Sequence, residues 1–436
     1  MNAASDSTVF VDSGLTWLGA VPAHWTVEPL RNITTFTTGW TPPTSDDTSY
    51  EGDNLWANIS DLREKTISTT AKALSTAAVQ ASRIPQSPVG SLLFSFKLSV
   101  GQVAITKCAM YTNEAIATFR ESSRLAVAYA YYSFPVALVQ NANENIYGAK
   151  LLNAQLIRSA RIPTPPLDEQ RQIAEYLDRE TGQIDVLIFK QEQLVDTLTE
   201  RRQAVIAQAV TRGLDPKTEL KHSGTAWLGE IPAHWLTPKV GLHFSVTLGK
   251  MLDAKRASQI DDVLLPYVRA GNIQEDELRL EDLYEMAFSP TEVRVLSLRV
   301  GDLLVVEGGA VGVNQLLEED LPGVSFQKTV NRVRARDQSS TAYLGFVLDV
   351  LRHRGVLDML CNKSTIAHFT ADKLQRIVYP QPPVDEQNAI VVHLRNETRN
   401  IDALIAKARQ VVEVLQERRQ ALISAAVTGK IDVRGL

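Results

Sequence analysis

The stretch PTPPLDEQRQIAEYLDRETGQIDVLI at residues 163–188 returns as PQPPVDEQNAIVVHLRNETRNIDALI at residues 380–405. Both stretches run on to a second shared segment, ERRQAVIAQAVTRGLD at 200–215 and ERRQALISAAVTGKID at 417–432. Across the two blocks of 53 residues, 28 aligned positions are identical. A block that recurs at a fixed offset marks an internal repeat, which decides the architecture before single elements are assigned.

Each block has the features of one long helix. A proline pair precedes it and cannot lie inside a helix, and two acidic residues follow, where they favour the positive end of the helix dipole. Gly213 and Gly429 are stop signals. Apolar residues recur every seven positions, with a second row three or four residues on, which is typical of a packing seam. The residues expected in this seam are Ile184, Leu187, Leu198, Ile401, Leu404 and Leu415.

A second repeated element stands in front of each variable region. DSGLTWLGAVPAHW at residues 12–25 returns as HSGTAWLGEIPAHW at 222–235. We interpret these segments as anchors that pack the entrance of each domain onto the helices. Between the repeated elements the halves diverge, with one faint echo, GSLLFSFKLSVG at 90–101 against GDLLVVEGGAVG at 301–312. Residues with strand character lie at 92–96, 102–106, 303–306 and 331–335.

The predicted fold is therefore α+β. Two domains of mixed α/β structure are separated by two long helices. We expect the helices to pack antiparallel, because the apolar stripe of each helix must be buried and the other helix is the nearest surface that can bury it. The internal repeat is expected to be pseudo-twofold. The predicted boundaries are 1–162 and 214–379 for the two domains, and 163–213 and 380–436 for the two helices.

Composition limits the function classes. The chain has 436 residues and a net charge of -5. It has no apolar run long enough to span a membrane, and its only cysteines, Cys108 and Cys361, form no disulfide framework. We expect a cytoplasmic protein. The acidic balance argues mildly against a simple nucleic-acid binder, but residues 12–162 carry 12 basic and 11 acidic groups, so a local basic patch is allowed.

Motifs of catalysis are missing. The sequence has no GxxxxGK[ST] phosphate loop, no glycine-rich cofactor loop and no Asn-Pro-Pro-aromatic element. Its seven histidines do not cluster in a metal-binding pattern. We therefore assign no catalytic residue and no metal ligand, and we expect a chain that is not an enzyme.

The order of the repeated motifs resembles a known family. WLG and P-x-HW, a variable region, PPLDEQ, Ile-Asp-x-Leu and ERRQ-A, followed by the same series again, resemble the specificity subunit of type I restriction–modification enzymes. Any single motif is only moderately specific, but the constant motifs frame the whole chain.

The resemblance implies more than the spacing does. Each variable region would be a target recognition domain that reads one half of a split site in double-stranded DNA, and the helices would fix the gap. Two methyltransferase subunits would dock on the chain, and two motor-nuclease subunits are further partners that the family allows. The cofactors, S-adenosylmethionine, ATP and magnesium, would all be bound by those partners and none by this chain.

The residues that contact DNA are predicted from chemistry alone, because positions that read bases vary with specificity. Phosphates favour Arg and Lys, and base edges favour Arg, Lys, Asn and Gln. The candidates are Lys65, Lys97, Lys107, Asn145, Lys150, Lys250, Lys255, Arg256, Arg269, Asn272, Lys328, Arg332, Arg334 and Lys363. Arg332, Arg334 and Arg336 alternate, so they are expected on one face of a strand.

Two other functions are open at this point. The first alternative is a coiled-coil scaffold that binds only proteins, which duplex DNA retention by the assembled complex would exclude. The second is a stand-alone DNA methyltransferase or nuclease, which lacks every motif named above.

Overall fold

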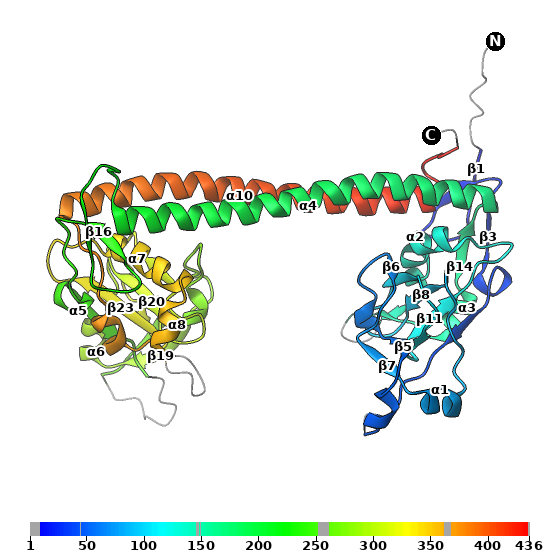
Figure 1. Ribbon diagram of the computed structural model, residues 1–436, viewed down its shortest axis with the longest axis horizontal. Coiled ribbons are helices and arrows are strands. Elements are labelled where there is room, and N and C mark those ends of the chain that lie inside the picture. The colour runs from blue at the N-terminus through cyan, green and yellow to red at the C-terminus, as the bar shows by residue number, and fades with distance from the viewer. Residues whose placement is uncertain are drawn as a thin grey trace, which may run out of the picture. The chain divides into compact units, whose positions relative to one another are not determined.

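The computed structural model describes residues 9–43, 45–144, 148, 150–251, 261–361 and 368–434. The chain divides into two compact units, Met1–Gln191 with Gln410–Leu436, and Glu192–Arg409. The two longest helices, α4 (Leu167–Arg212) and α10 (Val384–Val427), each contribute residues to both units (Figure 1). Each unit thus combines one variable domain with a part of each long helix.

The core of the first domain is a five-stranded sheet in the order β4-β11-β8-β9-β6. Its strands are β4 (Phe36–Thr38), β6 (Thr66–Ile67), β8 (Leu92–Ser95), β9 (Val103–Thr106) and β11 (Ile116–Phe119). Alternate side chains of β8 enter different cores. Leu92 and Phe94 pack with Phe134 of α2 (Val127–Ala137), whereas Leu93 packs with Ala57 and Ile67. The sheet is therefore covered on both faces, which explains why β8 and β11 are apolar and fully buried.

Shorter elements surround this sheet. They are the paired strands β1 (Phe10–Asp12) and β2 (Ala20–Pro22), β3 (Thr26–Pro29) and β14 (Arg161–Thr164), and β12 (Asn143–Glu144) and β13 (Lys150–Leu151). A three-stranded sheet joins β10 (Tyr111–Thr112), β5 (Asn54–Ala57) and β7 (Lys72–Leu74). The remaining helices are α1 (Thr76–Ser82), α3 (Ala154–Ser159), η1 (Leu30–Asn32), η2 (Asp47–Tyr50), η3 (Ile59–Asp61) and η4 (Val139–Asn141).

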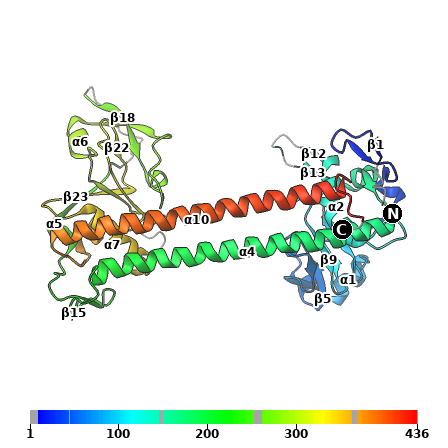
Figure 2. The same ribbon diagram turned by 90° about the horizontal axis from the view of Figure 1, so that it is seen from above.

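The core of the second domain is a four-stranded antiparallel sheet in the order β17-β23-β20-β21. Its strands are β17 (Phe244–Leu248), β20 (Leu303–Val306), β21 (Asn314–Leu316) and β23 (Val330–Ala335). Leu303 and Val305 face Tyr343 of α7 (Thr341–His353), and Leu304 packs on the other face with Phe326. Figure 2 shows α7 close to the long helices.

The second domain also has a smaller sheet and several short elements. The sheet joins β19 (Tyr284–Phe288), β18 (Val263–Val268) and β22 (Ser325–Phe326). The other elements are β15 (Leu220–His222), β16 (Glu230–Pro232), α5 (Val240–His243), η5 (Ala270–Asn272), α6 (Pro290–Val295), α8 (Val356–Leu360) and α9 (Ala371–Arg376).

The two variable domains share a topology that their sequences hardly show. The strand order β4-β11-β8-β9 with helix α2 corresponds to β17-β23-β20-β21 with helix α7. The faint echo in the sequence covers β8 and β20 with the loop that follows each, and the four predicted strands lie at β8, β9, β20 and β23. The predicted α+β fold and the strand assignments are confirmed.

The long helices pack antiparallel within each unit, as predicted. In the first unit Ile173 and Leu177 of α4 share a core with Ile423 of α10, and Asp185 pairs with Arg419 at 2.8 Å. The numbering thus rises along one helix and falls along the other. In the second unit the repeat-equivalent pair Arg202–Asp402 lies at 2.9 Å. The same ion pair therefore recurs once in each unit.

Two of the predicted seam residues are wrong. The side chains that turn inward on α4 follow a strict spacing of four and three residues, through Thr181, Ile184, Ile188, Gln191, Val195 and Leu198. Ile184, Leu198 and Ile401 are 5–8% exposed, and Leu415 is partly buried. Leu187 and Leu404, by contrast, are 48% and 53% exposed. A strict heptad seam buries a narrower stripe than the apolar pattern covers, so these leucines face away from the partner helix.

Candidate nucleic-acid interface and the anchoring of the domains

A carboxylate in the first turn of each long helix holds the entrance of its domain. In the first unit the Trp25 indole Nε1 donates to Glu169 Oε1 at 3.0 Å, and His24 Nε2 lies 2.8 Å from Glu169 Oε2. In the second unit Trp235 and His234 reach Glu386 Oε2 at 3.1 and 2.8 Å. The sequence prediction that the PAHW segments anchor the domains to the helices is confirmed.

A buried glutamine next to each carboxylate completes the anchor. Gln170, fully buried, accepts a hydrogen bond from the Ala126 backbone N–H at 2.8 Å and donates to the Pro165 carbonyl at 2.9 Å. Gln387 makes the equivalent contacts with Ser340 N–H and the Pro382 carbonyl, both at 2.9 Å. Each glutamine thus ties the start of the domain helix α2 or α7 to the proline pair. This requirement explains why the PPxDEQ motif returns unchanged.

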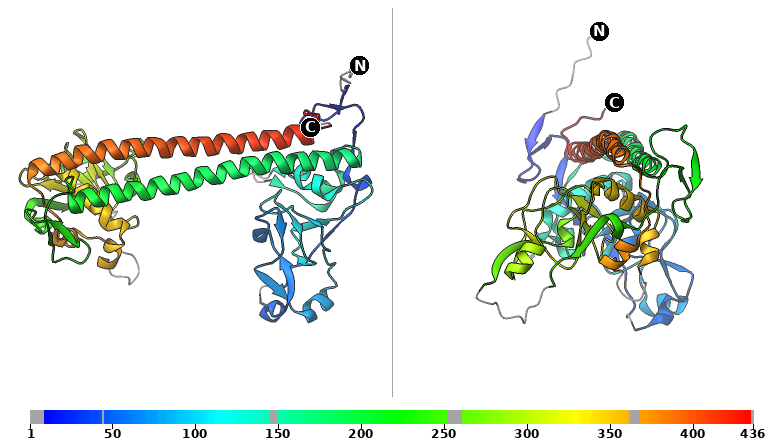
Figure 3. Two further views of the ribbon diagram at one scale, coloured as in Figure 1. Left: turned by 45° about the horizontal axis from the view of Figure 1, so that its top comes forward. Right: turned by 90° about the vertical axis from the view of Figure 1, so that its left-hand side faces the viewer.

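The far end of each long helix meets the domain of the same unit. The Tyr129 hydroxyl donates to the Val427 carbonyl at 3.4 Å, and the Tyr343 hydroxyl donates to the Val210 carbonyl at 3.2 Å. Gly429 follows α10 with a φ of +74°, and a Cβ there would lie 2.4 Å from Pro22 Cδ. Only glycine fits such a left-handed position with so close a neighbour. Figure 3 shows this end of the chain near the entrance of the first domain.

Four predicted DNA-contact residues are exposed. They lie on loops or on a short strand of their domains: Lys97, Lys107, Lys150 and Lys328. Four others, Asn145, Lys255, Arg256 and Lys363, lie outside the described residues.

Lys65 faces the helix instead of open solvent. It forms an ion pair with Asp178 of α4, and its ammonium lies 5.3 and 5.4 Å from the ring centroids of Tyr131 and Tyr132. The Tyr132 hydroxyl also donates to Asp178, at 2.5 Å. Lys65 therefore helps to hold the first domain on α4.

The basic residues of β23 are used inside the second domain. Arg332 is 5% exposed and donates to the carbonyls of Val295 and Ser297 at 2.9 and 2.7 Å. Burial lowers the pKa of Arg332. Arg334 holds both oxygens of Asp302 at 2.6 Å, a bidentate pair whose hydrogen bonds raise the Arg334 pKa. Both side chains also donate to the Ser297 carbonyl, which agrees with the prediction that these arginines lie on one face of a strand.

Three further candidates are occupied by internal contacts. The Lys250 side chain is 10% exposed and bonds Glu292 at 2.5 Å. Burial raises the pKa of Glu292, but the hydrogen bonds from Lys250 and Ser289 outweigh it and lower the pKa to about 2. The Arg269 guanidinium stacks 3.9 Å from the Tyr284 ring centroid, and Asn272 is 4% exposed. We therefore no longer include Lys250, Arg269, Asn272, Arg332 and Arg334 among the candidate DNA contacts.

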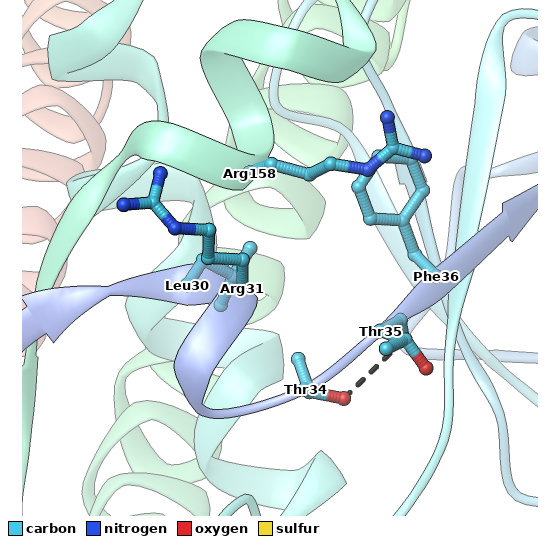
Figure 4. A pocket seen from close by; sticks show the side chains of 6 residues that line it. All are labelled: Leu30, Arg31, Thr34, Thr35, Phe36 and Arg158. Atoms are coloured by element: carbon cyan, nitrogen blue, oxygen red, sulfur yellow. Dashed lines mark hydrogen bonds between the residues drawn. The ribbon is translucent and has the colours of Figure 1, made fainter.

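A basic hollow in the first domain was missed by the sequence argument. Arg31 of η1 and Arg158 of α3 line it, and the ring of Phe36, the first residue of β4, lies beside Arg158 (Figure 4). The Arg158 guanidinium lies 5.3 Å from the Phe36 ring centroid. The lining residues are Leu30, Arg31, Thr34, Thr35, Phe36 and Arg158, and none is acidic. Guanidinium groups with hydroxyl groups beside them suit a phosphate. No local motif marks this hollow, because its arginines are far apart in the chain.

Two classes of feature are missing from the described part of the chain. No three His, Cys, Asp or Glu side chains there come together as a metal site would require. None of the described helices is both long enough and apolar enough to cross a membrane.

Comparison with known proteins shows what the chain is similar to. Residues 22–194 match the family model described as the type I restriction modification DNA specificity domain. The MjaVIII specificity subunit of Methanocaldococcus jannaschii is 20% identical over 427 residues, which cover 95% of each chain. The EcoBI specificity subunit of Escherichia coli is 25% identical over 309 residues, covering 67% of this chain and 62% of that protein.

Solved structures show the same fold. A chain from a study of complex assembly and conformational transition in the type I R-M system matches with a TM-score of 0.71 and 16% identity, covering 94% of this chain and 99% of that one. The HsdS subunit from Thermoanaerobacter tengcongensis matches with a TM-score of 0.51 and 15% identity, covering 94% and 98%. With its repeated frame of anchors and paired helices, the chain is similar over 95% of its length to a specificity subunit of a type I restriction–modification enzyme, and its residues 22–194 match the DNA specificity domain of that family.

Proposed function

We propose that this chain reads a bipartite site in double-stranded DNA, with one half-site read by each variable domain. The observation that carries the proposal is the repeated frame around two unlike domains. The anchors at Glu169 and Glu386 are the same, and so is the strand order of the sheets, whereas the exposed loops differ. Two domains that are attached in the same way but expose different loops fit the recognition of two different DNA sequences. We expect this complex to act in the cytoplasm.

We further propose that two methyltransferase subunits dock on the long helices. Leu187 and Leu404 are repeat-equivalent and about half exposed, and Leu194 and Val411 are a second such pair, 43% and 36% exposed. Exposed apolar side chains at the same places in both repeats fit two copies of one partner. Motor-nuclease subunits would complete the restriction enzyme. S-adenosylmethionine, ATP and magnesium would be bound by these partners, and this chain would have no reaction of its own.

The purified chain is expected neither to methylate nor to cleave DNA. The measurement is methyl transfer from S-adenosylmethionine to duplex DNA, with the chain alone and with the chain assembled with its methyltransferase subunits. Adenine N6 methylation at one bipartite sequence is expected only from the assembly. Transfer by the chain alone would contradict the assignment as a non-catalytic subunit. An assembly that binds no duplex DNA would contradict DNA recognition and favour a protein-binding scaffold.

Specificity is expected to be modular. Replacing residues 26–160 with the equivalent region of a relative should change one half-site and leave the other intact, because the exchange leaves the whole second domain and the motif of Pro165 and Gln170 unchanged. The methylated sites of the assembled complex, mapped by sequencing, give both half-sites at once. A simultaneous change of both half-sites would contradict independent reading by the two domains.

A further inference from the structure

The hairpin loop between β8 and β9 in the first domain is held in one shape. The buried Ser95 hydroxyl donates to the Ser99 carbonyl and accepts from the Gln102 backbone N–H at 3.0 Å. The Gly101 N–H bonds the Ser95 carbonyl at 2.9 Å, and the Val100 N–H bonds the Leu98 carbonyl at 3.0 Å. The loop therefore holds its tip in a defined position on the sheet.

The second domain has the same loop between β20 and β21. The Gly312 N–H bonds the Val306 carbonyl at 3.0 Å, and the Val311 N–H bonds the Gly309 carbonyl at 3.0 Å, which matches the two backbone bonds of the first loop. Gly309 has a φ of +86°, and Leu98 at the equivalent position has a φ of +60°. The loop shape thus calls for a left-handed residue, and the second domain supplies glycine.

Leu98 is therefore an exception that its own domain does not explain. A bulky residue at positive φ is strained, and such strain concentrates at functional sites. Leu98 is also 87% exposed, so its side chain contributes almost nothing to the core. Among the described large apolar residues no other is as exposed. Glycine would adopt this backbone conformation without strain, so neither the backbone nor the core of the first domain calls for leucine here.

The surroundings of Leu98 are those of a surface that can bind bases. Leu98 borders a shallow hollow of about 380 Å³ that is also lined by Arg63, Gln102, Ser60, Ser99 and Ile59. The Arg63 Nε donates to the Ser60 carbonyl at 2.8 Å, which directs the guanidinium. Lys97 is the exposed residue before Leu98. Arginine and glutamine recognise base edges, lysine contacts phosphates, and an apolar tip matches the thymine methyl group in the major groove.

We propose that Leu98 is a specificity-determining residue of the first domain, which makes an apolar contact with the methyl group of a thymine base in its half-site. Lys97 and Arg63 contact the DNA on either side of that base. This inference rests on the proposed DNA recognition and adds the residue through which one half-site is read. The second domain has Gly309 at the same place, so its half-site is read without such a contact.

The test uses the chain assembled with its methyltransferase subunits. Leu98→Gly installs the residue of the second domain, and Leu98→Asn removes the apolar side chain while tolerating a left-handed backbone. Both variants should retain or raise the melting temperature, because strain is relieved and no core contact is lost. In site selection from random duplex DNA, discrimination at a base pair of the first half-site should fall by about tenfold, within the usual range for one lost base contact. The second half-site should be unchanged.

Two controls separate the outcomes. Val89→Ala removes another exposed apolar side chain of the first domain, 64% exposed, and should leave both half-sites unchanged. Replacing a thymine of the first half-site by uracil should weaken binding of the native protein but not of Leu98→Gly. An unchanged first half-site in both Leu98 variants, or an equal loss in Val89→Ala, would overturn the inference. If the native complex selects no DNA sequence, the proposed function itself fails.

Discussion

Aspartate in place of Ile184 or Ile401 should unfold the helix pair at its seam. The two side chains are repeat-equivalent and 7% and 5% exposed, and Ile401 packs with Leu198 and Ile405. A carboxylate at either position would lose its hydration without gaining a partner. The expected cost is on the order of several kcal/mol, which approaches the whole stability margin of a domain. Thermal unfolding followed by circular dichroism measures the effect.

The matched control is Leu187→Asp, three residues further along α4. Leu187 is 48% exposed, so its substitution should change the stability by less than about 1 kcal/mol. The same change is expected to weaken capture of the methyltransferase subunits, because Leu187 belongs to the proposed docking surface. Equal melting temperatures for Ile184→Asp and Leu187→Asp would contradict the heptad seam.

Lengthening both long helices should lengthen the gap between the two half-sites. Seven residues inserted after Gln191 and after the repeat-equivalent Ala408 add about 10.5 Å to each helix, at roughly 1.5 Å per residue. Base pairs are stacked about 3.4 Å apart, so the gap can grow by at most about three base pairs. The insertion points lie next to the boundary between the two units, in helices that belong to both. Methylated sites selected from random DNA report the gap.

The length of the insertion is chosen from the seam. Seven residues keep every inward position in phase, whereas four residues exceed one turn by about 40° and displace the seam. The seven-residue variant should therefore retain more affinity than a four-residue variant. Both half-site sequences should be unchanged, since nothing within either domain has moved. An unchanged gap from a folded and active seven-residue variant would mean that something other than the helices sets the spacing.

The sequence by itself determined the architecture. Repeats of 53 residues and paired entrance motifs predict two long helices and two domains, and the structure has α4, α10 and both Trp anchors where these motifs stand. The information is strong because a helix start, a heptad and a helix stop are all local patterns. Strands β8, β9 and β20 were found for the same reason, through short apolar runs, and β23 through the alternation of its arginines.

Only the tertiary structure decided which residues turn inward. From the sequence pattern, Leu187 and Ile188 are equally good candidates for the seam. In the structure Ile188 is partly buried and Leu187 is exposed. From its residue type, Arg332 was a candidate DNA contact. In the structure its guanidinium instead donates hydrogen bonds to the carbonyls of Val295 and Ser297. Arg31 and Arg158 became candidate phosphate contacts only in the structure, where η1 and α3 place them in the lining of one hollow. Leu98 became conspicuous through its backbone angle, because no pattern of residue types reveals a φ of +60°. Burial, facing and backbone conformation depend on what packs against a residue, and that partner is distant in the chain.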